Sequence, residues 1–220
     1  MKKKIGIIGQ NFGRVVEKEA AKEYKVCWII GSEEDYMMQK EVDLVYIASP
    51  TEFHYEQAIF FLKNKVAVVL EKTPCLSVSA VKKLIYEAKK NNSYIYFSDL
   101  IRFRSDITKK LKNFSKIIWT KNDDHEDWVL SRLGYHYLYL IAMSNDKDII
   151  VQSANVTKDR TMINLILGTK EVYLDFEQNA TKNIHQIDDE CLGKSPSGSI
   201  QKMLTHKNLT HENINRNNEV

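Results

Sequence analysis

The sequence predicts an α/β protein: a doubly wound parallel sheet followed by a smaller, shortened α+β second domain. Short apolar runs alternate with amphipathic segments through the first 98 residues, which is typical of strand–helix–strand units. The alternation stops near Asp99, and later strand-like runs flank a Gly168–Lys170 turn, which indicates a hairpin. The 220 residues suffice for two small domains. We therefore expect one domain over residues 1–98 and a second over 99–220, with a polar tail from about residue 195.

The first domain is expected to contain five buried strands, each short, apolar and rich in β-branched residues. They are Lys4–Gly9, Val26–Ile30, Leu44–Ala48, Val66–Leu70 and Tyr94–Phe97. Helical spacing of apolar residues and N-capping side chains predict the intervening helices. These are Phe12–Glu23, Glu33–Glu41, Thr51–Lys63 (capped by Thr51 or Ser49) and Ser77–Asn91 (capped by Ser77 or Ser79).

The second domain is expected to mix helices with antiparallel strands. Two helices are predicted, at Ser105–Phe114 and around Leu130–Met143. Four strands are predicted, at Lys116–Thr120, Ile149–Thr157, Met162–Leu167 and Val172–Phe176.

Composition excludes several classes of function. Apolar residues make up 43% and charged residues 28%, and the net charge of +3 is spread along the chain, so no basic face predicts nucleic-acid binding. No apolar run approaches the roughly 20 residues of a membrane span, and no signal peptide is recognisable. The three cysteines, Cys27, Cys75 and Cys191, are far apart, which disfavours disulfides and zinc. A cytoplasmic protein is expected.

A glycine-containing turn follows the first strand. Residues Gly9, Gln10, Asn11, Phe12 and Gly13 form a Gly-x-x-x-Gly pattern where a dinucleotide-binding turn would place its glycines. Asn11 replaces the middle glycine, and asparagine tolerates left-handed backbone angles well. The pyrophosphate of a dinucleotide would rest on the N-terminus of the next helix. A plain strand-to-helix turn is the alternative interpretation.

The end of the second strand bears on the choice between NAD and NADP. The segment there is Gly31-Ser32-Glu33-Glu34, where a ribose-binding acid is expected. Glu33 would bind ribose hydroxyls, whereas Gly31-Ser32 without an immediate acid would admit a 2′-phosphate. No arginine stands beside Ser32, and the sequence favours NADP over NAD only slightly.

Two more segments end parallel strands and should meet at the same edge of the sheet. Ser49-Pro50-Thr51 follows the third strand, and Glu71-Lys72-Thr73-Pro74 follows the fourth. Ligands bind at the carboxyl edge of such sheets. Lys72 would donate a proton to a carbonyl oxygen, or polarise it, while hydride moves to or from a nicotinamide. The alternative is an ordinary surface lysine.

These residues resemble the glucose–fructose oxidoreductase/inositol dehydrogenase (Gfo/Idh/MocA) family. The resemblance rests on Ala48-Ser49-Pro50, on His54, on Glu71-Lys72 and on Ile101–Arg104, and it covers residues 4–104 well. It implies a Rossmann-type dinucleotide-binding domain and an NAD(P)-dependent oxidoreductase acting on a sugar, cyclitol or nucleotide-sugar. It also implies that Lys72 is catalytic or orients the substrate and that the protein is a homo-oligomer. The residues expected at the cofactor site are Ser32, Ser49, Pro50, Thr51, His54 and Glu71. Ser49, Pro50 and Thr51 would line the nicotinamide side, and Glu71 would orient Lys72.

The family commonly places Asp-x-x-x-His on a helix that faces the substrate. By this resemblance His136 is a second catalytic candidate, but position 132 is Arg132 rather than aspartate. Thr73 also separates Lys72 from Pro74, and the second domain is short for the family. Two hypotheses follow: a sugar oxidoreductase, or a catalytically weak dinucleotide-binding sensor or partner subunit.

Overall fold

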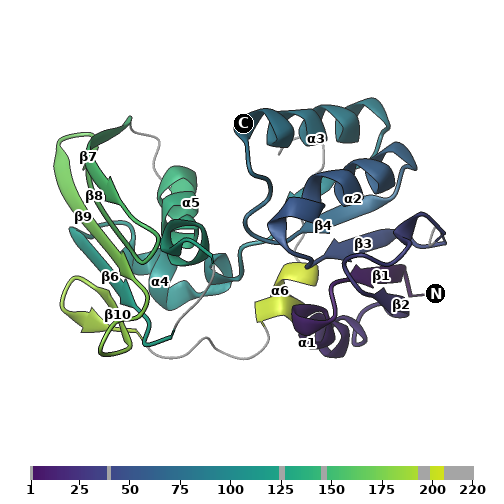
Figure 1. Ribbon diagram of the computed structural model, residues 1–220, viewed down its shortest axis with the longest axis horizontal. Coiled ribbons are helices and arrows are strands. Elements are labelled where there is room, and N and C mark those ends of the chain that lie inside the picture. The colour runs from purple at the N-terminus through teal and green to yellow at the C-terminus, as the bar shows by residue number, and fades with distance from the viewer. Residues whose placement is uncertain (1, 39–40, 124–126, 145–147, 193–198, 206–220) are drawn as a thin grey trace. The chain divides into compact units, whose positions relative to one another are not determined.

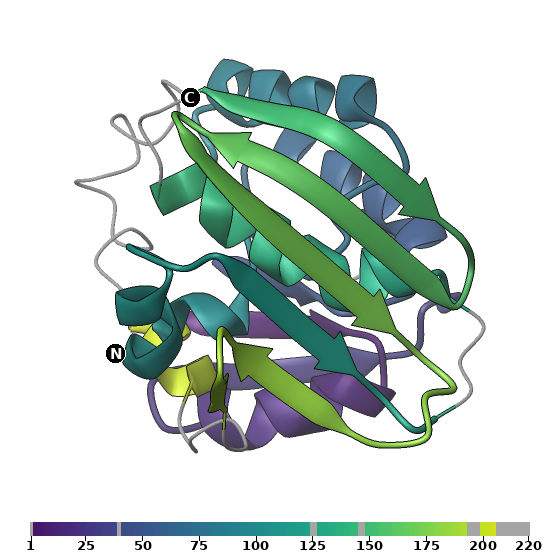
Figure 2. The ribbon, with the colours of Figure 1, turned by 90° about the vertical axis from the view of Figure 1, so that its left-hand side faces the viewer.

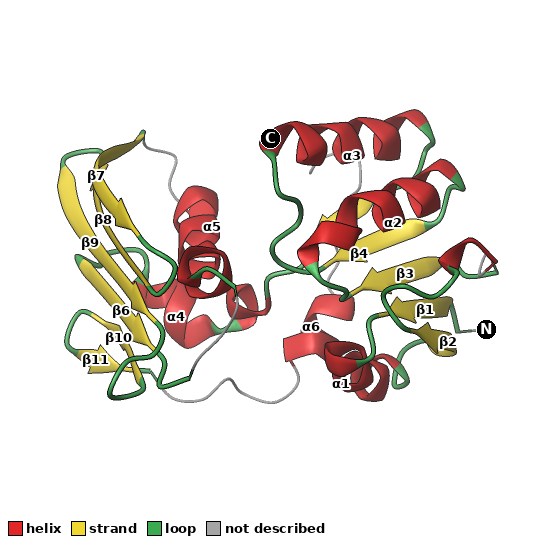
Figure 3. Cartoon of the chain, viewed as in Figure 1, coloured by secondary structure: helices red, strands yellow, loops and turns green. Residues whose placement is uncertain are grey.

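The computed structural model describes residues 2–38, 41–123, 127–144, 148–192 and 199–205, which form two compact units. The first unit contains the chain up to Leu100 together with α6 (Ser199–Leu204), and the second begins at Ile101. Strands and helices alternate in the first unit, whereas long neighbouring strands dominate the second (Figure 3).

The first unit is built on a five-stranded, fully parallel sheet, which confirms the predicted fold class. Its order is β2-β1-β3-β4-β5, so the chain winds one way from β1 to β2 and the other way from β3 to β5. The strands are β1 (Lys4–Ile8), β2 (Lys25–Ile30), β3 (Leu44–Ile47), β4 (Ala67–Leu70) and β5 (Ile95–Phe97). Every residue of β3 and β4 is buried, because helices cover both faces of such a sheet.

Helices α2 (Thr51–Lys63) and α3 (Val78–Lys90) cover one face of this sheet, and α1 (Asn11–Ala20) covers the other (Figure 1). Ser77 caps α3, accepting a hydrogen bond from the Ala80 N–H at 3.2 Å. The predicted side-chain cap of α2 is wrong: Pro50 is its N-cap residue and makes no side-chain bond. A helix was predicted over Glu33–Glu41, but the structure has only a short 3-10 turn there, η1 (Tyr36–Met38). Residues 39–40 of the predicted helix lie outside the described residues.

The C-terminal helix α6 belongs to the first unit, whereas the sequence suggested a polar tail of the second domain from about residue 195. It packs against α1, and the Tyr24 hydroxyl donates to the Leu204 carbonyl at 3.1 Å. Met203 and Leu204 are buried, with 0% and 3% of their surface exposed. Ile200, Met203 and Leu204 have helical spacing, but three apolar residues within a single short segment were too weak a signal to predict this helix.

The second unit is built on a six-stranded sheet of order β11-β10-β6-β9-β8-β7 (Figure 2). Antiparallel pairing joins β7 (Ile149–Val156), β8 (Arg160–Leu167) and β9 (Lys170–Glu177), as the predicted hairpin implied. Strand β6 (Lys116–Thr120) pairs in parallel with β9, and β10 (Ile184–Ile187) and β11 (Glu190–Cys191) follow on its far side. The sequence did not predict β10 or β11, because Ile-His-Gln-Ile in a polar stretch gives little strand signal.

Helices cover one face of the second sheet. The turn η2 (Leu100–Phe103) leads into α4 (Ser105–Lys110), which ends earlier than the predicted Ser105–Phe114 helix. The predicted Leu130–Met143 helix is a π-helical segment, η3 (Leu130–Gly134), continued by α5 (Tyr135–Ser144). Gly134 permits close packing on the sheet, since a Cβ atom there would lie 3.2 Å from the ring of Phe176.

Substituting Gly9→Ala should test the close approach of β1 and β3. Gly9 has φ of +101°, and a Cβ atom there would lie 2.4 Å from the Ala48 carbonyl oxygen. We expect a loss of roughly 2–4 kcal/mol in the free energy of unfolding, measured by chemical denaturation. Gly31→Ala is the matched control, because its new Cβ would meet only the flexible carboxylate of Glu34. Equal losses in the two variants would contradict this account.

Candidate functional site

The first unit has a topological switch point between β1 and β3, where the winding of the chain reverses. Crevices at the carboxyl ends of such strands are the usual ligand sites of parallel sheets. Here the Gly9 N–H donates to the Ile30 carbonyl at 2.9 Å, and the Ala48 N–H donates to the Ile8 carbonyl at 2.8 Å. The ends of β1, β2 and β3 are therefore held together at this edge.

The turn after β1 leads directly into the N-terminus of α1. Gln10 is the N-cap residue and its side chain makes no capping bond to the helix. Asn11 is the first helical residue and does not use the left-handed angles that asparagine tolerates; in this turn Gly9 has them. Gly13 lies against β1, where a Cβ atom would be 2.9 Å from a methyl group of Ile7. Small residues and an uncapped helix start are what a phosphate-binding turn requires.

The acid that reaches this turn is Glu34. Its Oε1 atom accepts from the Gly31 N–H at 2.8 Å and from the Gln10 side-chain amide at 3.2 Å. Glu34 and its neighbour Glu33, to which the sequence pointed as the ribose-binding acid, are both exposed. Glu34 therefore places a negative charge between the β1 and β2 loops, where a ribose would be recognised.

Gln57 is a buried bridge that sequence reasoning missed. Only 1% of its surface is exposed, and its amide donates to the Ser32 carbonyl at 2.7 Å. Its carbonyl oxygen accepts from the Ser49 hydroxyl at 2.6 Å. A glutamine among the apolar residues of α2 was the available signal, since a buried amide must find partners. Ser49, itself buried, thus braces the β3 loop, while Pro50 and Thr51 lie nearer the surface.

His54 joins the loops that follow β3 and β4. It is fully buried in α2, with Nε2 2.7 Å from the Ser49 carbonyl oxygen and Nδ1 2.9 Å from that of Thr73. Burial lowers the pKa of this imidazole, so its neutral form is favoured. A neutral ring donates through one nitrogen only, so it makes one of these two bonds at a time. His54 therefore links the loop after β3 to the loop after β4.

Lys72 follows β4 at the same edge, beside an anchored carboxylate. Glu71 accepts from the Tyr46 hydroxyl and, at 2.8 Å, from the Ser98 hydroxyl. Its other oxygen accepts from the Lys72 backbone N–H at 3.2 Å. The Lys72–Thr73 peptide bond is cis. The first unit thus brings together the predicted residues of the β1, β2, β3 and β4 loops.

His136 lies in the second unit, near the start of α5. Its ring centroid is 5.8 Å from that of Trp119 on β6. Arg132, four residues earlier, forms a two-pronged ion pair with Asp123, with N–O distances of 2.9 and 2.6 Å. A cation held by a carboxylate therefore stands where the family pattern places an aspartate.

A second histidine of this unit, His185 on β10, is more strongly perturbed. Its ring stacks on Trp119 at 4.3 Å between centroids, and its Nε2 atom lies 2.6 Å from the Tyr137 hydroxyl. Burial, followed by the positive charges of Arg104 and Lys121, lowers the pKa of His185 to about 4. The tautomer of the neutral ring decides whether His185 or the Tyr137 hydroxyl donates this hydrogen bond. The sequence gave no signal for this residue because β10 was not predicted.

Metal-binding clusters and membrane-spanning helices were looked for among the described residues. Across the described ranges, no three His, Cys, Asp or Glu side chains gather in a way that would hold a metal ion. Among the helices of those ranges, none combines the length and apolar character needed to cross a membrane.

The switch point, the glycine turn and the polar strand ends together define a Rossmann-type dinucleotide-binding domain. Residues 3–98 match the GFO_IDH_MocA family model, described as an oxidoreductase family with an NAD-binding Rossmann fold. The first domain of this chain therefore matches the NAD-binding Rossmann domain of the Gfo/Idh/MocA oxidoreductase family. The comparison with curated proteins found no match.

Solved structures resemble the chain beyond its first domain. UDP-N-acetylglucosamine 3-dehydrogenase GnnA from Acidithiobacillus ferrooxidans has a TM-score of 0.74 and 17% identity, over 85% of this chain and 73% of that one. D-galactose-1-dehydrogenase from Rhizobium etli has a TM-score of 0.70 and 17% identity, over 86% and 77%. An Agrobacterium radiobacter oxidoreductase, in complex with NAD+, L-tartaric acid and magnesium, has a TM-score of 0.68 and 15% identity, over 90% and 70%. These likenesses show a shared fold that includes the second sheet.

Acidification should destabilise the second unit through His185. Its folded pKa of about 4 lies below the unfolded value of 6.5, so the unfolded chain binds the proton more tightly. The stabilisation is complete above about pH 6.5 and is lost as the pH falls toward about 4. We expect a loss of roughly 1–2 kcal/mol, after discounting for partial exposure.

The measurement is denaturation across this pH range, followed by the fluorescence of Trp119, which contacts the imidazole. His185→Gln should remove this pH dependence, and His136→Gln should keep it, since the His185–Tyr137 bond remains. An unchanged pH dependence in His185→Gln would contradict the assignment.

Proposed function

We propose that this protein is an NAD-dependent oxidoreductase that acts on a sugar, cyclitol or nucleotide-sugar, with Lys72 as its catalytic or substrate-orienting residue. The observation that carries the proposal is the position of Lys72 at the carboxyl end of β4, beside Glu71 and next to the switch point. The named relatives act on UDP-N-acetylglucosamine and D-galactose, which supports a sugar-like substrate.

The residues of the first unit fit a dinucleotide. The backbone N–H groups at Asn11, Phe12 and Gly13 start α1 without a side-chain cap and would hold the pyrophosphate. Gly9 brings the turn within contact of Ala48, where a larger residue would not fit. Pro50 and Thr51 would line the nicotinamide side. When bound, the nicotinamide supplies or accepts the hydride.

Lys72 would handle the oxygen of the reacting carbon. Its ammonium donates a hydrogen bond to a carbonyl oxygen during reduction, or accepts the hydroxyl proton through its neutral form during oxidation. His136 is the second candidate for proton transfer. His136 is half-exposed on α5, and its ring lies beside that of Trp119.

Glu34 favours NAD over NADP, which reverses the slight preference inferred from the sequence. Its carboxylate lies against Gly31 and Gln10, at the strand end that recognises the ribose. A carboxylate accepts hydrogen bonds from ribose hydroxyls and repels a 2′-phosphate.

A catalytically weak dinucleotide-binding sensor or partner subunit is the second candidate function. The observation that favours it is the Arg132–Asp123 ion pair. This pair puts a neutralised cation at the position where the family pattern has a substrate-facing aspartate.

Dinucleotide binding should be selective and should depend on Glu34. We expect NADH to bind with a Kd on the order of micromolar, and NADPH at least about tenfold more weakly, by calorimetry. Glu34→Gln should narrow this difference because it removes the repelling charge. Glu33→Gln, one residue away and exposed, should leave it unchanged. Failure of the wild-type protein to bind either dinucleotide would contradict the proposed function.

Lys72→Met should separate the two candidate functions. If the enzyme reading holds, kcat with an active nucleotide-sugar should fall at least about a hundredfold, while the Kd for NADH changes little. Lys63→Met, in the last turn of α2 and exposed, is the matched control and should behave as wild type. The assay follows nicotinamide absorbance with a panel of sugars and nucleotide-sugars. Substrate turnover that survives in Lys72→Met would rule out the role given to Lys72.

A further inference from the structure

Three polar side chains gather on one face of the first sheet, at the ends of β3, β4 and β5. Strand register explains this: Tyr46 pairs with Val69, which pairs with Tyr96. Side chains alternate along a strand, so Glu71 and Ser98, two residues beyond Val69 and Tyr96, point to the same face as Tyr46. Tyr46 and Ser98 have no exposed surface.

Counting protons fixes the direction of the bonds in this cluster. Tyr46 and Ser98 each carry one hydroxyl proton, and the Oε1 atom of Glu71 is within reach of both. Hydrogen bonds to a carboxylate are stronger than those between neutral groups, so both protons go to Glu71. The Tyr46–Ser98 contact of 3.3 Å then carries no proton of its own. Burial and the nearby Glu71 charge raise the pKa of Tyr46, which therefore stays protonated.

The other oxygen of the same carboxylate reaches the catalytic candidate. Glu71 Oε2 accepts from the backbone N–H of Lys72 at 3.2 Å. A carboxylate held through one oxygen by two hydroxyls has little freedom to turn. The peptide at Lys72 is therefore fixed relative to three strands of the sheet.

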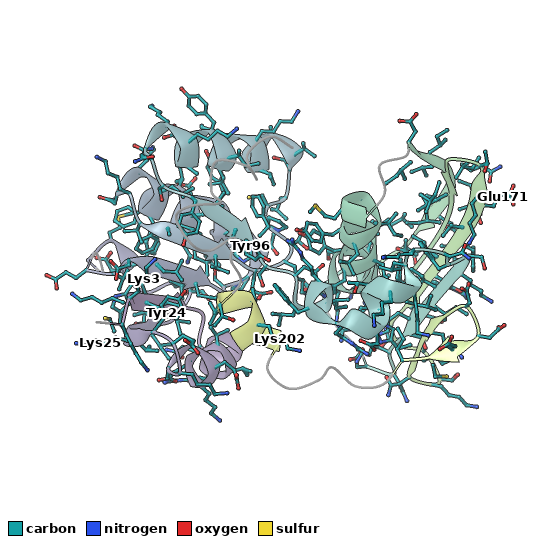
Figure 4. The ribbon with its side chains drawn as sticks, turned by 180° about the vertical axis from the view of Figure 1, so that it is seen from behind. Lys3, Tyr24, Lys25, Tyr96, Glu171 and Lys202 are labelled. Atoms are coloured by element: carbon teal, nitrogen blue, oxygen red, sulfur yellow. The ribbon has the colours of Figure 1, made fainter. Side chains whose placement is uncertain are left out.

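The C-terminal helix covers this cluster. The Sδ atom of Met203, a fully buried residue of α6, lies 3.2 Å from the Ser98 oxygen. Tyr24, in the loop between α1 and β2, holds the end of the same helix by its bond to Leu204. Figure 4 labels Tyr24 and, on α6, Lys202, which locate the contact between Tyr24 and this helix. Met203 thus contacts Ser98, one of the two hydroxyl residues that hold Glu71.

We propose that Tyr46 and Ser98, covered by Met203, are positioning residues that hold Glu71 in one orientation and, through it, the backbone of Lys72. Tyr46 is flanked by the aliphatic residues Ile7 and Val69, so a phenylalanine would fill the same space and only the hydroxyl is specific. The expected effect on catalysis rests on the proposed function. The expected effect on the orientation of Glu71 and the Lys72 backbone does not.

Tyr46→Phe is the test, with hydrogen exchange of the Lys72 amide as the first readout. The amide should exchange at least about tenfold faster, because the carboxylate that accepts it loses a charge-assisted partner. The Kd for NADH should stay within about twofold, since Tyr46 lies outside the residues assigned to the dinucleotide. With an active substrate, kcat should fall about tenfold while the KM stays near wild type.

Tyr24→Phe is the control for a merely structural role. It removes a hydroxyl that also holds α6 but leaves both donors to Glu71 in place. It should leave the exchange of the Lys72 amide unchanged. The single variant Glu71→Gln should also speed the exchange of the Lys72 amide. Adding Tyr46→Phe to Glu71→Gln should change this rate little further, since both substitutions act through the same carboxylate.

Unchanged exchange of the Lys72 amide in Tyr46→Phe would overturn the inference, and so would equal acceleration in Tyr24→Phe. Loss of dinucleotide binding by the wild-type protein would instead overturn the proposed function. The exchange measurement needs no substrate, so the two failures are distinguishable.

Discussion

Hydrogen bonds between consecutive loops hold the carboxyl edge of the five-stranded sheet together. Gln10 and Glu34 join the β1 and β2 loops, and Gln57 joins the β2 and β3 loops. His54 joins the β3 and β4 loops, and Glu71 joins the end of β4 to β3 and to the segment after β5. A buried polar group without a partner costs about 1–3 kcal/mol, so the bridges through the buried Gln57 and His54 constrain both loops that each contacts. The site is therefore positioned by a continuous series of contacts along the edge.

This series explains which site residues could be predicted from the sequence and which could not. Gly9, Gly13 and Lys72 could be proposed from the sequence because each lies at a recognisable position relative to the end of a predicted strand. Gln57 and Tyr46 were missed because the sequence does not show which residue forms a hydrogen bond with a polar residue inside an apolar run. Tyr46 pairs with Glu71, 25 residues later, and only the parallel register brings the two together. A buried tyrosine hydroxyl nonetheless requires a partner, which was the available signal.

The fold was predictable to the extent that its contacts are local. Each strand–helix–strand unit of residues 1–98 is close in sequence, so hydrophobic periodicity was sufficient. In the second unit, β6 pairs with β9 across more than fifty intervening residues, and β10 adds to its other side. Such pairings leave no periodic pattern between the partners. Helix α6 returns to the first unit through Met203 and Leu204, two side chains in a polar segment.

The roles of Ser49 and His54 follow from burial rather than from the motif that contains them. Both were assigned to the cofactor, yet the Ser49 hydroxyl is occupied by Gln57 and the imidazole lies between two backbone carbonyls. Side chains whose polar atoms face groups inside the protein can act on a ligand by fixing the loops that touch it. A residue of this kind is as sensitive to substitution as a contact residue. Substitution data alone would therefore not separate a clamp from a ligand, whereas the hydrogen-bond partners do.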